Sequence, residues 1–214
     1  MIIAVDGPTA SGKGTVSKEL AKHFGLPFLD TGLLYRAVGW TLREQGGDAD
    51  NPADALAACN FESALLDNPG LRSEAVGGLA SRVSVHPDVR RALDKRQKDF
   101  ARQPGGAVLD GRDIGTVIAP DADVKLFVTA SPEARAVRRF EEMKRRGEQV
   151  DFDDILADIL QRDERDQNRV IAPLKPAADA VLLDTTNLTI DAAIQQAIAL
   201  VNAKTSGRRD KDPA

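Results

Sequence analysis

Short apolar runs recur along the chain between segments of mixed polarity. The runs are residues 2–5, 27–30, 106–111, 124–130 and 179–185. Each is short and mostly apolar, as is typical of a strand buried in a parallel sheet. In most of the segments between them, apolar residues recur at helical spacing. This alternation of strands and helices predicts an α/β fold with a central five-stranded parallel sheet covered by helices on both faces.

One stretch of the chain does not follow this alternation. Residues 46–104 show helical patterns without an obvious buried strand, so we interpret them as an insert that carries part of a binding site. Further along, Ser131 and Pro132 predict the start of a helix and Gly147 predicts its end. Serine caps helices, proline fits their first turn and glycine ends them. A second, charged helix is predicted over residues 151–169.

The stretch "DGPTASGKGT" joins the first predicted strand to an amphipathic helix. Gly7, Gly12 and Lys13 fit the template G-x-x-x-x-G-K, in which glycines let backbone N–H groups curl around phosphate oxygens. The N-terminus of the following helix offers N–H groups and partial positive charge to the same anion. Lys13 can then reach the β- and γ-phosphates. The plain alternative is a glycine turn, but the strand before, the helix after and the lysine in register favour a phosphate-binding loop.

Two details of this loop depart from what is common. Gly14 follows the lysine where Ser or Thr usually stands, and Thr15 comes next, so the hydroxyl that usually binds magnesium is displaced by one residue. We therefore expect Thr15 to approach magnesium through water. Thr9, Ala10 and Ser11 also make the loop interior poorer in glycine than is usual in related loops.

Composition excludes several classes of partner. The chain has 214 residues, 42% of them apolar, which supports one domain with a real core. A formal charge of −4 and a pI near 5.3 leave no basic footprint for a nucleic-acid polymer. Cys59 is the only cysteine, which suits a reducing compartment. No apolar stretch is long enough to span a bilayer, and the chain opens on a strand rather than a signal peptide, so we expect a cytoplasmic protein.

Polar residues follow two of the predicted strands. Asp30 and Asp110 each stand at a strand end, where ligands gather in open α/β sheets. Taken singly, these aspartates and Thr31 could equally be helix caps and turn formers. Arg36 lies on the helix after Thr31, and Arg112 lies in the turn after Asp110. Because planar guanidinium forks suit phosphate, the two arginines favour a second phosphate-binding site.

Two charged helical segments allow two interpretations each. Arg162, Asp166 and Arg169 fall at i, i+4 and i+7, which places them on one side of a helix. Such a stripe is more often a solvated, salt-bridged face than a binding surface. The stretch "EARAVRRFEEMKRRGE" could likewise be a surface helix, or a lid that brings arginines to a transferring phosphoryl group.

The chain resembles the bacterial cytidylate kinases, which are P-loop nucleoside monophosphate kinases. The similarity runs, in order, through "DGPTASGKGT", "LDTGLLYR", "HPDVRRAL", "LDGRDIGTV", "RDERDQNR", "APLKPAADA" and "LLDTTNLT". The ending "GKGT" is shared with adenylate kinases, whereas the later motifs and the long insert are more specific. The resemblance implies a three-layer P-loop kinase fold with a nucleotide-binding insert and a helical lid. It also implies transfer of the γ-phosphate of ATP to CMP or dCMP, with Mg²⁺ as cofactor and a role in pyrimidine nucleotide metabolism.

The resemblance implies boundaries within one domain over residues 1–214. The core would comprise residues 1–45, 105–131 and 170–204, with the insert over about 46–104 and the lid over about 140–155. The polar tail, residues 205–214, is predicted to be disordered. We expect a monomer whose partners are small nucleotides.

The resemblance also implies two sets of binding residues. ATP would be bound by Gly7, Pro8, Thr9, Ala10, Ser11, Gly12, Lys13, Gly14 and Thr15. CMP would be bound by Thr31, Tyr35, Arg36, Ser81, Arg90, Arg112, Asp113, Arg162, Asp166 and Arg169. The catalytic residues would be Lys13, Arg36, Asp110 and Arg112, and Thr15 and Asp110 would contact Mg²⁺ through water.

Within the CMP set, the resemblance gives each part of the nucleotide its own residues. The phosphate would be held by Tyr35, Arg36, Arg112 and Arg169, and the ribose by Arg162 and Asp166. The base would be read by Ser81, Arg90 and Asp113. The chemistry agrees, because a carboxylate accepts from the 4-amino group of cytosine and an arginine donates to O2 and N3. Uracil would set an acceptor against that carboxylate.

Two alternatives differ in what they require. A different P-loop kinase could act on UMP or on a non-nucleotide alcohol, but an alcohol would need a carboxylate base and fewer arginines. A GTP-dependent switch would need a guanine-reading N-K-x-D after a late strand, and the only such place reads "LLDTTNL". The arginines favour an acceptor that already carries phosphate.

Overall fold

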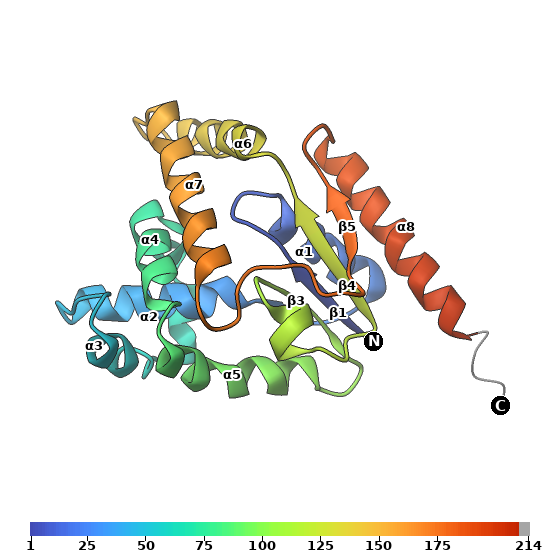
Figure 1. The fold of residues 1–214 in the computed structure, drawn as a ribbon, viewed down its shortest axis with the longest axis horizontal. Coiled ribbons are helices and arrows are strands. Elements are labelled where there is room, and N and C mark those ends of the chain that lie inside the picture. Colours follow the sequence, from blue (N-terminus) through green and yellow to red (C-terminus); the bar gives the residue numbers. More distant parts are fainter. Residues whose placement is uncertain (210–214) are drawn as a thin grey trace.

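The computed structural model describes residues 1–209 and is built around one parallel sheet (Figure 1). The strands are β1 (Ile2–Asp6), β2 (Phe28–Asp30), β3 (Ala107–Gly111), β4 (Val124–Thr129) and β5 (Val181–Asp184). They lie in the order β2-β3-β1-β4-β5, and every neighbouring pair is parallel. β1 is central, so the loop that follows it opens at the carboxyl edge between its neighbours.

Helices connect these strands and extend beyond the sheet. The α-helices are α1 (Lys13–Phe24), α2 (Thr31–Glu44), α3 (Pro52–Ala57), α4 (Glu74–Val83), α5 (Pro87–Ala101), α6 (Pro132–Arg145), α7 (Phe152–Asn168) and α8 (Ile190–Arg209). The shorter turns are the 3-10 helices η1 (Ser63–Asp67) and η2 (Pro69–Arg72) and the π-helical turn η3 (Ile114–Ile118).

The period of two along β1 sends its side chains to both faces of the sheet. Ile3 and Val5 pack in a fully buried cluster with α1 and α8, which includes Val16 and Leu20. Ala4 packs on the opposite face with the end of α5 and with η3. The sheet is therefore the middle of three layers, and the strands read as continuous apolar runs because both of their faces are covered.

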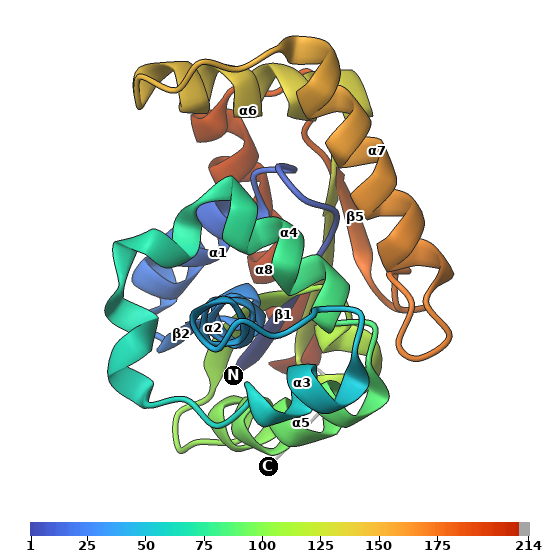
Figure 2. The ribbon, with the colours of Figure 1, turned by 90° about the vertical axis from the view of Figure 1, so that its left-hand side faces the viewer.

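Two helical groups stand at the carboxyl edge of the sheet (Figure 2). One is the insert, in which α3, α4 and α5 pack with α2 around buried side chains such as Leu34, Val38 and Val83. The other is the α6–α7 pair, which packs through Ala136 and Ile159. Both groups project from the sheet and face each other across the loop after β1.

The predicted strands and helix limits can be compared directly. The sheet is five-stranded and parallel, as predicted, and α6 begins with the Ser131 hydroxyl accepting from the Ala134 N–H at 3.2 Å. α6 ends at Arg145 before Gly147, whose φ of 79° lies in the left-handed region. α8 continues to Arg209, so residues 205–209 are helical where the sequence predicted a disordered tail, and residues 210–214 lie outside the described part. Within residues 1–209, no helix combines the length and apolar character needed to cross a membrane.

Candidate active site

The loop between β1 and α1 is held in shape by close backbone packing. A Cβ at Gly7 would lie 2.0 Å from the Val128 carbonyl oxygen, so only glycine lets the loop pass β4. The Thr185 hydroxyl donates to the Ser11 carbonyl at 2.9 Å, and Arg135 Nη1 donates to the Thr9 carbonyl at 3.3 Å. These contacts fix the loop before any phosphate binds, as a cradle of N–H groups requires.

Ala10 is the non-glycine residue of this loop that has a positive φ. Its φ is 56°, in the left-handed region that favours glycine. Its methyl group packs against the apolar cluster of α6 and α7. The loop is therefore in direct contact with the α6–α7 pair, which compensates for the unfavourable backbone angle.

Lys13 and Asp110 form a buried pair at the base of the loop. Lys13 Nζ lies 3.6 Å from Asp110 Oδ1, and their side chains are 12% and 5% exposed. Burial lowers the pKa of Lys13, and burial raises the pKa of Asp110 to about 6 although Lys13 opposes that shift. A polyphosphate bound here would place negative charge beside Lys13 and so favour the ammonium form that burial disfavours.

The glycine after Lys13 has a steric reason. A Cβ at Gly14 would lie 3.2 Å from Asp110 Oδ2, so a serine or threonine there would crowd the carboxylate. Thr15 is exposed in the first turn of α1 and lines the same cavity as Asp110. Among the described residues no group of three or more His, Cys, Asp or Glu could hold a metal. One carboxylate and one hydroxyl fit Mg²⁺, which keeps most of its waters and binds substrate phosphates.

Two cavities adjoin at this point. The donor-phosphate cavity, about 320 Å³, is lined by residues 9–15 together with Asp110, Arg139 and others. The acceptor cavity, about 100 Å³, is lined by every residue of the predicted CMP set: Thr31, Tyr35, Arg36, Ser81, Arg90, Arg112, Asp113, Arg162, Asp166 and Arg169. Arg36 and Arg112 line both cavities, so they stand where the two would exchange a group.

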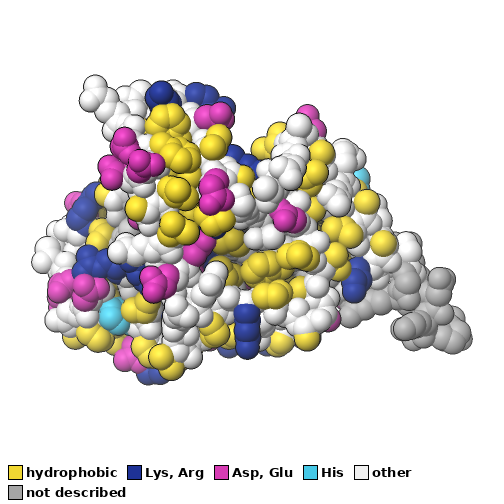
Figure 3. Space-filling view, turned by 45° about the horizontal axis from the view of Figure 1, so that its top comes forward, with side chains coloured by type: hydrophobic (Ala, Val, Ile, Leu, Met, Phe, Trp, Pro, Cys, Tyr) yellow, Lys and Arg dark blue, Asp and Glu magenta, His cyan; other side chains and the backbone are white. Residues whose placement is uncertain are grey.

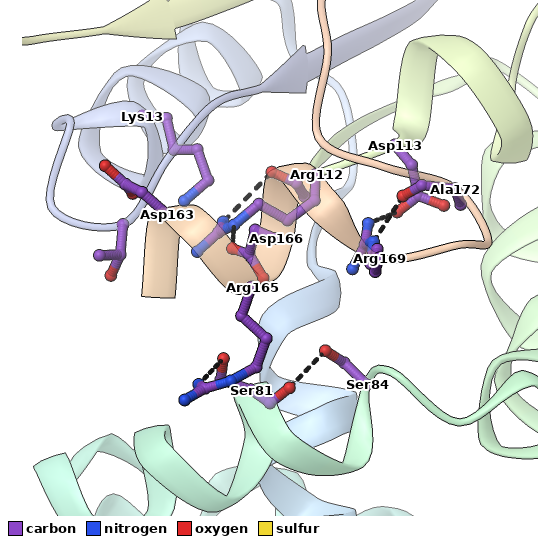
Figure 4. Close-up of polar contacts among 12 residues, drawn as sticks. Lys13, Ser81, Ser84, Arg112, Asp113, Asp163, Arg165, Asp166, Arg169 and Ala172 are labelled. Atoms are coloured by element: carbon purple, nitrogen blue, oxygen red, sulfur yellow. Dashed lines mark hydrogen bonds and ion pairs between the residues drawn. The ribbon is translucent and has the colours of Figure 1, made fainter. Parts of the chain in front are cut away.

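The arginines at this junction are aimed by partners of their own. Arg36 Nη1 donates to the carbonyls of Leu71 and Ser73 at 2.8 and 3.0 Å. Burial, reinforced by nearby Arg162, lowers the pKa of Arg36 to about 10. Arg112 Nε donates to Asp166 Oδ2 at 2.8 Å (Figure 4). Each guanidinium keeps further N–H groups for an incoming anion.

The far end of the acceptor cavity is built around Asp113. It is 5% exposed and accepts from Arg90 through Oδ2 and from Arg169 Nη2 through Oδ1 at 3.4 Å. Since each carboxylate oxygen can accept more than one hydrogen bond, the group can take a further donor from a ligand. Ser81 Oγ accepts from Arg165 Nη1 at 2.7 Å, which joins α4 to α7 (Figure 4).

Several residues of this region were missed by the sequence analysis. Arg139 lines the donor-phosphate cavity, and its signal was the basic stretch over residues 133–148. Another cavity of about 230 Å³ lies beside Gly12 and is mostly apolar. Its lining includes Val16, Arg138, Thr185, Leu188 and Ile190. Figure 3 shows the molecule hollowed between the α6–α7 pair and the region of β5, with basic side chains inside the hollow.

The chain was compared with known proteins. A family model described as cytidylate kinase matches residues 3–203. This chain belongs to the cytidylate kinase family. The cytidylate kinase of Rhodopseudomonas palustris is 56% identical over 210 residues, covering 98% of this chain and 99% of the relative. That of Methylocella silvestris is 54% identical over 215 residues, covering 100% of both chains.

Membership of the cytidylate kinase family makes this chain a nucleoside monophosphate kinase and confirms the family predicted from the sequence. A gluconokinase structure from Sinorhizobium meliloti covers 99% of this chain and 97% of its own, with a TM-score of 0.53 and 16% identity. That likeness shows the fold alone. Because a kinase of a sugar acid shares this fold, the acceptor has to be argued from the site rather than from the architecture.

Proposed function

We propose that this protein is a cytidylate kinase that transfers the γ-phosphate of ATP to CMP or dCMP, giving CDP or dCDP and ADP. The observation that carries the proposal is the junction of the two cavities at Arg36 and Arg112. A phosphate donor on one side and a phosphate acceptor on the other would meet there. Positioning and charge neutralisation then supply most of the catalysis, as in other phosphoryl transfers.

On the donor side, the loop of residues 7–15 would hold the phosphates of ATP. Residues 9–15 of this loop, Lys13 among them, line the cavity of about 320 Å³. Asp110 and Thr15 would hold Mg²⁺ through its waters, and the ion would offset the negative charge of the donor phosphates. The apolar cavity beside Gly12 suits a nucleobase, since it joins apolar walls to the Arg138 guanidinium.

On the acceptor side, Arg36, Arg112, Arg169 and Tyr35 would hold the phosphate of CMP, and Arg162 and Asp166 the ribose. An acceptor phosphate oxygen is already anionic near neutral pH, so no strong general base is needed. The guanidiniums would instead gather charge as it develops on the moving phosphoryl group.

For the base, Asp113 would accept from the 4-amino group of cytosine while Arg90 and Ser81 contact the other polar edge. Arg90 and Asp113 are 3% and 5% exposed, and they bond each other. A site this buried selects strongly, because the wrong base leaves a polar group without a partner.

We further propose that residues 46–104 serve as the acceptor-binding insert and residues 140–155 as a lid. Closing the two groups over the nucleotides would exclude water that would otherwise hydrolyse ATP. A cytoplasmic monomer is part of the proposal and rests on composition and the lone Cys59.

The second candidate is a related P-loop kinase acting on UMP or on a non-nucleotide alcohol. A coupled assay of ADP release with each common nucleoside monophosphate, and with gluconate as an alcohol control, separates the two. We expect turnover to be highest with CMP and dCMP. Faster turnover with UMP or with the alcohol would overturn the proposed acceptor.

A further inference from the structure

Glu74, the first residue of α4, joins three helices that are distant in sequence. Its Oε2 accepts from Arg139 Nε of α6 at 2.8 Å and also from Arg139 Nη2. Its Oε1 accepts from Arg162 Nη2 of α7. One carboxylate thus connects the insert to both helices of the α6–α7 pair, which face α4 in Figure 2.

A third guanidinium lies beside this carboxylate. A Cβ at Gly77, one turn along α4, would come within 2.9 Å of Arg36 Nη2 and 3.1 Å of Arg162 Nη1. The two arginines therefore meet over Gly77, and a side chain there would displace the ends of both guanidiniums. Burial alone would raise the pKa of Glu74, but the charges of Arg162 and Arg139 reverse this and hold it below its usual value.

Glu74 contacts a lining residue of each nucleotide cavity without lining either cavity itself. Glu74 lines neither the donor-phosphate cavity nor the acceptor cavity. Arg139 lines the first, and Arg162 lines the second. Glu74 meets both arginines at a separate cavity of about 330 Å³. It therefore contacts one arginine of each proposed nucleotide site from outside that site.

We propose that Glu74 is a positioning residue that couples the binding of the donor to the binding of the acceptor. The inference rests on the proposed function, because it requires a nucleotide in each cavity. A long arginine side chain loses rotamer freedom when it is ordered by a ligand. When the acceptor orders Arg162, Glu74 is fixed as well and presents Arg139 to the donor already aligned. The second nucleotide then binds with less ordering left to be done.

The test measures a coupling factor rather than an activity. Calorimetry of the full chain gives the Kd of a non-hydrolysable ATP analogue with Mg²⁺, in the absence and presence of saturating CMP. In the unmodified protein we expect CMP to lower the Kd of the analogue at least about fivefold, within the usual range for coupled sites. The analogue must tighten CMP by the same factor, because coupling is reciprocal.

Glu74→Gln keeps the size of the side chain and removes the charge that both arginines share. We expect its coupling factor to fall to about twofold or less. Asp158→Asn is the matched control, since Asp158 Oδ2 contacts Arg162 Nε at 2.8 Å but has no contact with Arg139 among the described residues. It should keep the coupling factor of the unmodified protein. A merely structural contribution of Glu74 would lower the melting temperature without changing this factor.

Three outcomes separate the possible failures. If neither nucleotide binds the unmodified protein, the proposed function itself is wrong. If both bind with a coupling factor near one, or if Glu74→Gln keeps the full factor, the inference is overturned and the function stands. Should Glu74→Gln not fold, Arg139→Lys repeats the test from the other partner, because a lysine cannot make the paired contact to Oε2. Persistence of full coupling in that variant would also overturn the inference.

Discussion

The two proposed phosphate sites of this molecule are built in opposite ways. The proposed donor loop is one run of residues, 7–15, and most of what it would offer an anion is backbone N–H. The proposed acceptor cavity draws its lining from Thr9 and from residues between 31 and 169, on α2, α4, α5 and α7 and near the end of β3, and it offers mostly side chains. The donor loop is a local structure, whereas the acceptor site exists only when the insert and α7 meet.

Their charge balance differs accordingly. The loop of residues 7–15 contributes one cation, Lys13, which pairs with buried Asp110, and the arginines that line the donor-phosphate cavity come from other parts of the chain. The acceptor lining holds five arginines and two aspartates, namely Arg36, Arg90, Arg112, Arg162, Arg169, Asp113 and Asp166. Lys13 is the one cation that the loop itself supplies, so it should be hard to replace. Among five arginines, removal of one should cost less activity than removal of Lys13 does.

Lys13→Met tests the donor site and should have the largest effect. The variant removes the one lysine in the loop and leaves the backbone cradle. We expect kcat/KM to fall by about 10³-fold or more, on the scale reached by single charge-stabilising groups in phosphoryl transfer. The circular dichroism spectrum should be unchanged. A coupled ADP-release assay measures the loss.

Lys22→Met on the same helix is the control, because Lys22 is exposed and stands away from the loop. It should keep normal turnover. Near-normal activity of Lys13→Met would contradict the assignment of the loop and remove the contrast between the two sites.

Arg36→Ala and Arg112→Ala test the acceptor site. Losing one charge-assisted contact in a buried site costs about 1.5–3 kcal/mol, or about 10- to 150-fold in kcat/KM for CMP. The Kd of the ATP analogue should change much less. Arg91→Ala is the control, since Arg91 is exposed and pairs only with Asp88 among the described residues. A loss confined to ATP affinity would place the two arginines on the donor side.

The same contrast explains how much of the molecule could be predicted. The strands and the loop depend on neighbours in sequence, so apolar runs and glycine spacing identified them. Arg36 and Arg112 were predicted from their places after two strand ends. The residues that would read the base came from resemblance, because nothing local distinguishes Ser81 or Arg90 from other polar residues on helices. Their meeting in one cavity is a property of the packed insert.

Contacts between distant segments left no sequence signal. Glu74 meets arginines 65 and 88 positions later, and Ser81 meets Arg165 84 positions later. The sequence alone favoured a solvated face for the stripe of Arg162, Asp166 and Arg169, but all three side chains are buried in the structure. Composition also misled at the C-terminus, where polar residues 205–209 extend α8.

Asp113→Asn tests whether the acceptor site reads the base as well as the phosphate. An amide presents both a donor and an acceptor, so it should tolerate uracil better than a carboxylate does. We expect activity on CMP to fall and the CMP-to-UMP ratio of kcat/KM to shrink by about tenfold or more. Phosphate and ribose contacts remain, so the change is one of ratio. An unaltered ratio would leave Asp113 as a buttress for Arg90 and Arg169.

Asp6 links the two sites and gives the smallest expected effect. It ends β1 just before the donor loop, and its Oδ1 and Oδ2 accept from the N–H groups of Ile114 and Gly115, each at 2.8 Å. Those N–H groups fix the turn after Asp113. Near pH 5 Asp6 is protonated, and its hydroxyl oxygen still offers a lone pair to one of these N–H groups. Asn would turn an NH₂ donor toward that N–H instead, so Asp6→Asn should lower the free energy of unfolding by about 1–3 kcal/mol. Asp99→Asn is the control, because Asp99 pairs with Lys95 on the exposed face of a helix. It should change the free energy of unfolding by less than about 0.5 kcal/mol.

The pH dependence of that loss has a definite sign. Burial, reinforced by Asp113 and Asp110 but opposed by the two N–H groups, raises the pKa of Asp6 from 3.8 to about 7. Between those values the unfolded chain has released a proton that the folded protein keeps, so the Asp6 contribution to stability falls as pH rises. Asp6→Asn lacks this contribution. The free energy of unfolding of the unmodified protein minus that of Asp6→Asn should therefore fall from pH 4 to pH 7 and then stay constant. Urea denaturation at four pH values measures it. A gap that widened with pH would mean that Asp6 is ionised throughout and that its two N–H bonds outweigh its burial.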